Sequence, residues 1–149
     1  MFVIPSTTRR VELNTNEKIN KLIEQKTIGN INKYISSDVN TLTKKLEELN
    51  HEWDTERVLE ANAAAIIFIS SVTGLFTRRY RLFVTGIISF FLLQHAVQGW
   101  CPPLPIIRRL GVRTPAEIGE EKIAIKYLRG DFSQTNKEAV NIMKISKMD

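Results

Sequence analysis

The sequence has few residues of the kinds that build metal sites, disulfides and catalytic centres. Among its 149 residues there is one cysteine, Cys101, and there are two histidines, His51 and His95. A single cysteine excludes an intramolecular disulfide, and so few sulfur and imidazole groups predict no structural zinc site. The sequence also contains no phosphate-binding glycine loop and no pattern of a nucleophile triad, so we expect neither a cofactor nor an enzymatic activity.

Charge is absent from two apolar stretches, Ala61–Phe76 and Leu82–Val97, of 16 residues each. A helix of that length is about 24 Å long, and extension to Val58 and to Trp100 brings each to about 28 Å, close to the roughly 30 Å of a bilayer's hydrocarbon core. A basic turn, residues 77–81, joins them. We therefore expect an antiparallel two-helix transmembrane hairpin over residues 55–101. A soluble helical bundle with a very apolar central hairpin is the alternative.

The aromatic residues support the membrane interpretation. Trp53 precedes the first apolar stretch, Trp100 follows the second, and Tyr80 lies in the turn between them. In a hairpin the two tryptophans fall on one side of the bilayer and the tyrosine on the other, where amphipathic rings are enriched. These three residues are the expected interfacial anchors.

Small residues predict how the two helices pack. Ala63, Ser70 and Gly74 share one face of the first helix, and Thr85, Ser89 and Ala96 share one face of the second. Small side chains let helices approach closely in lipid, and hydroxyl groups can hydrogen bond across the contact. A turn centred on residues 79–80 would pair residues whose numbers sum to about 159, which places Ser70 opposite Ser89.

The remaining chain predicts helical arms, so the expected fold class is all-α. Residues 1–13 read as an extended arm, and residues 14–54 as an amphipathic helical region that begins at a capping box of Asn14 and Glu17. Residues 102–113 form a proline-rich interfacial segment. Thr114 and Pro115 start an amphipathic helix over 114–130. Residues 131–149 are expected to be a weakly helical or disordered tail.

One stripe in the N-terminal region predicts a packing surface. Val39, Leu42, Leu46 and Leu49 follow the 3-4 spacing of a coiled-coil seam. Two heptads are too short to stand alone, so the stripe needs a partner. Either it packs on the preceding helix of the same chain, or it binds a second copy or another membrane protein.

The basic residues flank the apolar segments, where they can contact anionic lipid head groups. They do not cluster on one helix face, so we expect no nucleic-acid partner. Under the positive-inside rule, six basic residues near the open end of the hairpin against three in the turn place both termini in the cytoplasm. The six are Lys44, Lys45, Arg57, Arg108, Arg109 and Arg113; the three are Arg78, Arg79 and Arg81.

The run from Gly99-Trp100-Cys101-Pro102 to Thr114, with the hairpin before it, resembles a small bacterial two-helix inner-membrane domain of unknown function. That domain also occurs fused to a rhodanese. The resemblance covers about residues 55–114 and implies an inner-membrane location. Because the sequence has no room for a rhodanese domain, the resemblance does not imply sulfurtransferase activity here.

These observations lead to one functional expectation and one alternative. We expect a non-catalytic membrane anchor or interaction module that self-associates or binds a partner. The alternative is an accessory protein that handles sulfur or transports a small anion, using the thiol of Cys101 or an oligomeric pore. His95, one turn from the end of the second helix, is expected to be a hydrogen-bonded interfacial side chain.

Overall fold

The computed structural model describes residues 5–76, 80–133 and 143. These residues form helices and connecting turns and contain no β-strand, which confirms the all-α fold class. The chain divides into two compact units, each made of non-contiguous segments. Unit 1 comprises Met1–Lys21 and Trp53–Pro115, and unit 2 comprises Leu22–Glu52 and Ala116–Asp149.

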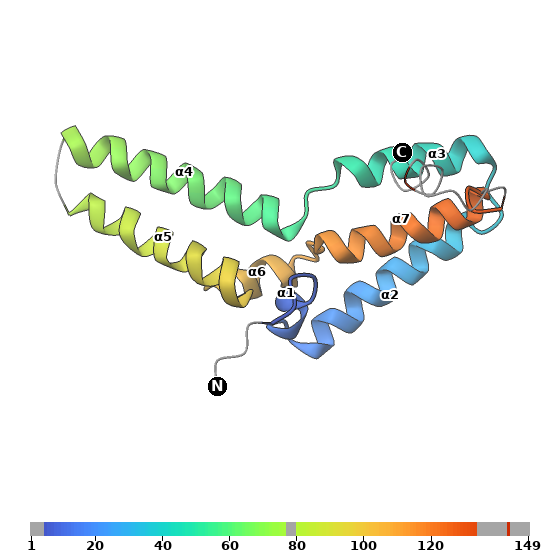
Figure 1. Ribbon diagram of the computed structural model, residues 1–149, viewed down its shortest axis with the longest axis horizontal. Coiled ribbons are helices and arrows are strands. Elements are labelled where there is room, and N and C mark those ends of the chain that lie inside the picture. The colour runs from blue at the N-terminus through green and yellow to red at the C-terminus, as the bar shows by residue number, and fades with distance from the viewer. Residues whose placement is uncertain (1–4, 77–79, 134–142, 144–149) are drawn as a thin grey trace. The chain divides into compact units, whose positions relative to one another are not determined.

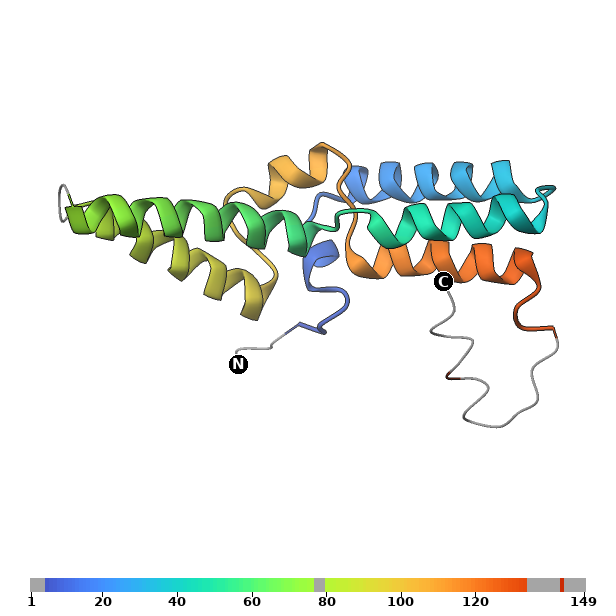
Figure 2. The same ribbon diagram turned by 90° about the horizontal axis from the view of Figure 1, so that it is seen from above.

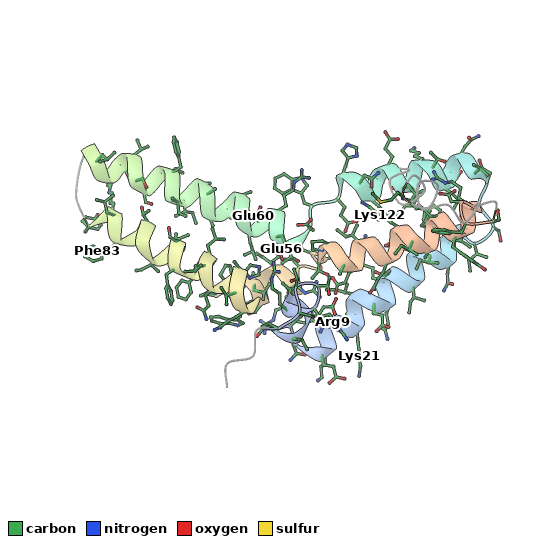
Figure 3. All side chains as sticks on the ribbon, viewed as in Figure 1. Arg9, Lys21, Glu56, Glu60, Phe83 and Lys122 are labelled. Atoms are coloured by element: carbon green, nitrogen blue, oxygen red, sulfur yellow. The ribbon has the colours of Figure 1, made fainter. Side chains whose placement is uncertain are left out.

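The predicted hairpin forms the larger part of unit 1. Helices α4 (Thr55–Phe76) and α5 (Arg81–Gln98) run antiparallel side by side (Figures 1 and 2). Both are long and apolar enough to cross a membrane. Their outer side chains are large, apolar and exposed: Phe68 is 70% exposed, and Phe83, on the outside of α5 near the turn, is 75% exposed (Figure 3). A helix surface of this kind fits lipid and not water.

The register of the hairpin differs from the prediction. Ser70 Oγ lies 2.7 Å from Thr85 Oγ1, and a Cβ atom added to Gly74 would lie 3.2 Å from the side chain of Leu82. Facing residues therefore have numbers that sum to about 156, and the predicted pairing of Ser70 with Ser89 is wrong by about one helical turn. The prediction placed the centre of the turn at residues 79–80, whereas α5 already begins at Arg81.

The inner face of α5 is also rotated from the predicted one. On α4, Ala63, Ser70 and Gly74 are half-buried or buried, as their predicted place in the contact requires. On α5, Ser89 and Ala96 are exposed, so these two packing predictions are wrong. The inward-facing residues of α5 are Thr85, Ile88, Leu92 and His95. Bulky side chains thus occupy the face that the small-residue pattern had assigned to Ser89 and Ala96.

The N-terminal segment is not the predicted extended arm. Residues Arg10–Leu13 form a helical turn, α1, and Val11 is buried in a small core with Leu59, Cys101 and Leu104. Helix α2 (Glu17–Tyr34) follows after a short bend. Its first turn is capped by Asn16, whose side chain accepts a hydrogen bond from the backbone N–H of Lys18. Asn14, the predicted cap, instead donates to the carbonyls of Arg10 and Gln98.

The proline-rich segment contains a helix that the sequence did not predict. Helix α6 spans Leu104–Arg109 and starts with Pro103 and Pro105 in its first turn. Proline is tolerated there because the N–H groups of the first turn have no partner within the helix. Leu104 and Arg108 are fully buried, whereas Ile106 is 63% exposed. The segment is therefore a short amphipathic helix.

Unit 2 is built from α2, α3 (Val39–His51) and α7 (Pro115–Arg129), which lie side by side (Figures 1 and 2). Leu42, Leu46 and Leu49 of the predicted stripe are buried against Ile118 and Ile125 of α7. The stripe is therefore an intramolecular core, and these three leucines are not a surface for a second copy. Val39, at the start of the stripe, is 59% exposed.

Local hydrogen bonds define the ends of these helices. Asp38 caps α3 by accepting from the N–H groups of Asn40 and Thr41, and the hydrogen bond from the Thr41 hydroxyl holds the pKa of Asp38 below its usual value. Asp54 caps α4 in the same way through the N–H of Arg57, so α3 and α4 are separate helices. Gly130, with φ of 86°, follows the last residue of α7. The predicted tail lies outside the described residues from 134 onward, except for Met143.

Candidate functional site at the open end of the hairpin

Several polar side chains and one glycine of unit 1 lie at the open end of the hairpin, opposite the turn. We call the set Arg10, Glu56, His95, Gly99 and Cys101 the hairpin base. Glu56 lies in the first turn of α4 (Figure 3). Its Oε1 accepts a hydrogen bond of 2.7 Å from Arg10 Nη2, and its Oε2 lies 3.8 Å from His95 Nε2. One carboxylate thus contacts side chains from α1 and α5.

His95 is buried without a hydrogen bond. Its side chain is 4% exposed, and neither ring nitrogen has a hydrogen-bond partner among the described residues. The prediction of a hydrogen-bonded interfacial histidine is therefore wrong. The Glu56 carboxylate is too far away for a hydrogen bond but near enough to attract a protonated ring. Glu56 thus lies between Arg10 and His95.

Cys101 is the predicted candidate thiol, and it lies in the interior of unit 1. It is 3% exposed and packs with Val11, Leu59 and Leu104. Burial raises the pKa of the Cys101 thiol from its usual 9.0, the N–H of Leu104 lowers this pKa, and the Glu56 carboxylate raises it. A reactive cysteine needs a lowered pKa and access to solvent, so this environment disfavours nucleophilic or persulfide chemistry.

A close backbone contact fixes α1 against the end of α5. Gly99 adopts φ of 75° at the C-terminus of α5, and a Cβ atom there would lie 2.5 Å from the backbone carbonyl carbon of Arg10. Only glycine allows both the left-handed conformation and this approach. The Gly-Trp-Cys-Pro sequence thus begins with a residue that the contact with α1 requires.

Arg108 provides a second link between the N-terminal segment and the end of the hairpin. Its side chain is fully buried, and it donates hydrogen bonds to Thr15 Oγ1, Asn20 Oδ1 and the carbonyl of Val112. Thr55 adds another link, because its N–H and hydroxyl both donate to the carbonyl of Arg113. These bonds join the segment after α1 to α6, and the start of α4 to the segment after α6.

The structure separates the predicted site residues into groups. Ser70, Gly74 and Thr85 lie together in the α4–α5 contact, and Cys101 lies near the other end of the hairpin. Trp53 and Tyr80 are 55% and 57% exposed, and the guanidinium of Arg57 lies 5.4 Å above the Trp53 ring. Trp100 is half-buried. The role of the three aromatic residues as membrane anchors remains a prediction.

Sequence reasoning missed Arg10 and Glu56 as partners. They are 46 positions apart, and no spacing pattern in the sequence connects them. One signal was present: Glu56 and Arg57 directly precede the apolar part of α4, where a charged side chain needs a partner or the head-group region.

Comparison with known proteins supports the membrane assignment. No curated protein and no solved structure matches the chain. Residues 54–116 match the family model described as the inner membrane protein YgaP-like transmembrane domain. The match includes α4, α5, α6 and the hairpin base from Glu56 to Cys101, and it agrees with the family resemblance seen in the sequence. The match covers 63 of the 149 residues and supports an inner-membrane domain over this part of the chain.

Proposed function

We propose that the protein is a non-catalytic membrane anchor whose hairpin attaches the α2–α3–α7 helices to the cytoplasmic face of the inner membrane. The observation that carries this proposal is the separation of cores. Leu42, Leu46 and Leu49 are buried with Ile118 and Ile125 in unit 2, whereas the hairpin leaves large apolar side chains such as Phe68 and Phe83 uncovered. In this proposal the leucine core of unit 2 is covered by its own chain, and lipid covers the exposed apolar side chains of the hairpin.

The connectivity of the chain supports the same proposal. The chain passes between the units after Lys21, after Glu52 and after Pro115. The second crossing directly precedes α4, and the third follows α6, so both adjoin the open end of the hairpin. A two-helix hairpin with its turn on one side of the membrane has both of its chain ends on the other side. The excess of basic residues on that side favours the cytoplasm.

The anchor would act by self-association or by binding a membrane partner. The described residues include no group of three or more histidine, cysteine or acidic side chains that could hold a metal ion. The buried Cys101, with its raised thiol pKa, favours the anchor over the sulfur-handling alternative. Two helices cannot enclose a pore, so small-anion transport would need an oligomer.

Topology and extraction test the anchor. In a Cys101→Ser background, single cysteines replace Tyr80 near the turn and the exposed Glu47 of α3. We expect the chain to resist carbonate extraction, and an impermeant maleimide to label Tyr80→Cys but not Glu47→Cys in spheroplasts. Glu47→Cys should react only after permeabilisation. Release by carbonate would overturn membrane insertion, and the reverse labelling pattern would overturn the orientation.

The interaction role needs a separate test. The full chain is purified from native membranes in mild detergent, and its mass and associated proteins are measured. A dimer, or a partner present in a fixed ratio, is the expected result. A monomer without partners would contradict the interaction role, and loss of a sulfur-linked phenotype in Cys101→Ser alone would favour the alternative.

A further inference from the structure

Unit 1 contains a cavity of about 590 Å³ between α4, α5 and α6. Its walls include Val58, Ala63 and Ile66 of α4, Leu92 of α5, and Ile106 and Leu110 at α6. The volume falls within the range of about 300–1,000 Å³ that is usual for ligand pockets. We call this space the α4–α6 cavity.

The walls of the α4–α6 cavity are almost entirely apolar. Asn62 and His95 also line it, but the Asn62 amide donates to the Val58 carbonyl, and both ring nitrogens of His95 are fully covered. The cavity therefore offers carbon atoms and few hydrogen-bonding groups. An occupant must be largely apolar, because a polar one would lose its hydrogen bonds to water.

The cavity opens at the surface of the membrane domain. Three of its lining residues are exposed at that surface: Ile66 by 46%, Ile106 by 63% and Leu110 by 78%. Because residues 54–116 form an inner-membrane domain, the medium beside α4 and α5 is lipid. Lipid acyl chains are thus the apolar molecules present at the highest concentration at the opening.

Helix α6 carries an exposed cation next in sequence to one lining residue of the cavity. Arg109 is exposed and directly precedes Leu110, whereas its neighbour Arg108 is fully buried and hydrogen-bonded to the N-terminal segment. A short amphipathic helix with exposed Ile106 and Leu110 and one exposed arginine has the composition of a segment lying among lipid head groups. A guanidinium there complements a phosphate.

We propose that the α4–α6 cavity binds one acyl chain of an anionic phospholipid, with Arg109 contacting the phosphate of the same lipid. The chain fills the apolar space between the hairpin and α6, and the head group lies at the level of the hairpin base. The site would thus select lipid by charge at Arg109 and retain it by burial of the chain.

Two tryptophan variants of the full-length protein test the acyl-chain site. Ala63→Trp fills the cavity, and Ala65→Trp places the same side chain at an exposed position of α4 outside the lining. The proteins are purified from equal amounts of phosphatidylglycerol and phosphatidylethanolamine, and retained lipid is measured by native mass spectrometry. We expect Ala63→Trp to reduce retained phosphatidylglycerol at least about tenfold. This is the effect of no longer burying roughly two methylene groups of the acyl chain. Ala65→Trp should retain it as the unsubstituted protein does.

The head-group contact is tested separately with Arg109→Gln. This variant should still retain lipid but lose its preference for phosphatidylglycerol, and an unchanged preference would overturn the role of Arg109. Equal retention by the two tryptophan variants would overturn the acyl-chain site. Loss of a dimer in Ala63→Trp, with no lipid retained by the unsubstituted protein, would show a second copy in the cavity instead.

A measurement on the unsubstituted protein covers the case in which Ala63→Trp does not fold. Phosphatidylglycerol with a photoreactive group near the end of one acyl chain is cross-linked in vesicles, and the modified residues are mapped. Modification concentrated on Ile66, Leu92 and Ile106 is expected. Modification spread evenly over the outer face of the hairpin, including Phe68 and Phe83, would overturn the proposal.

Discussion

Arg10 and Glu56 form an ion pair that joins the N-terminal helical turn to the first transmembrane helix. Arg10 Nη2 lies 2.7 Å from Glu56 Oε1, and the two side chains are 15% and 25% exposed. Because this pair is largely shielded from water, removal of either partner leaves the other charge poorly solvated. The loss of stability is therefore larger than for an exposed pair. The pair therefore makes α1 an integral part of the membrane domain.

Removing one partner of this pair should destabilise the protein more than removing both. We expect Arg10→Met to lower the free energy of unfolding by about 1–3 kcal/mol, and the double variant Arg10→Met, Glu56→Leu to recover part of that loss. Thermal unfolding in mild detergent measures the effect. Arg9→Met is the matched control, because Arg9 is 73% exposed and lies 3.7 Å from Glu12, so its loss should be nearly neutral. Equal effects of Arg9→Met and Arg10→Met would contradict the prediction.

A pair of glycine substitutions separates backbone strain from steric contact. Gly99 and Gly111 both have positive φ, 75° and 81°, but a Cβ atom at Gly111 has no neighbour within 4 Å. Gly111→Ala should therefore cost about 1–2 kcal/mol, the usual penalty for a left-handed residue. Gly99→Ala adds the clash with Arg10 and should lower the apparent melting temperature clearly further. Similar melting temperatures for the two variants would show that α1 does not pack against Gly99.

The α4–α5 register can be tested by double-mutant cycles. The hydrogen bond between Ser70 and Thr85 predicts a coupling free energy of about 0.6 kcal/mol between Ser70→Ala and Thr85→Val, the average for such bonds in membrane proteins. Ser70→Ala and Ser89→Ala should be additive, because Ser89 is exposed on α5. Unfolding equilibria in detergent give both values. Coupling to Ser89 but not to Thr85 would restore the register centred on residues 79–80.

The hairpin shows which features could be predicted from the sequence. The absence of charge and the length of the two stretches were enough to predict two spanning helices, because a bilayer accepts little else. The inner face of α4 followed from Ala63, Ser70 and Gly74. The face of α5 did not, since it depends on where the turn ends. A shift of one helical turn brings Thr85 opposite Ser70 and leaves Ser89 in lipid.

Contacts between distant segments were the least predictable. The leucine spacing of α3 predicted burial of Leu42, Leu46 and Leu49, but the partner, α7, lies about 70 residues later in the chain and has no complementary motif. The helical turn α1 is four residues long and has one buried side chain, Val11, too little for a periodic pattern. The contacts of Arg10 with Glu56 and Gly99 depend on the tertiary fold alone.

The buried thiol of Cys101 predicts slow chemical modification and a stability that falls at alkaline pH. Because burial raises the pKa of the Cys101 thiol above 9.0, little thiolate is present near pH 8, and alkylation should be much slower in the folded protein than in denaturant. Above pH 9 the unfolded chain loses this proton while the folded protein keeps it. The contribution to stability is thus complete below pH 9 and is lost as pH rises through the folded pKa.

Two variants turn this into a measurement. The difference in unfolding free energy between the unsubstituted protein and Cys101→Ala should be constant from pH 6 to about pH 8 and should shrink above pH 9. Glu47→Cys in the Cys101→Ser background supplies an exposed thiol for comparison, and it should react with iodoacetamide at the rate of an ordinary cysteine. Reaction of Cys101 in the folded protein at that same rate would contradict the buried environment. It would also revive the possibility that the thiol carries chemistry at the membrane surface.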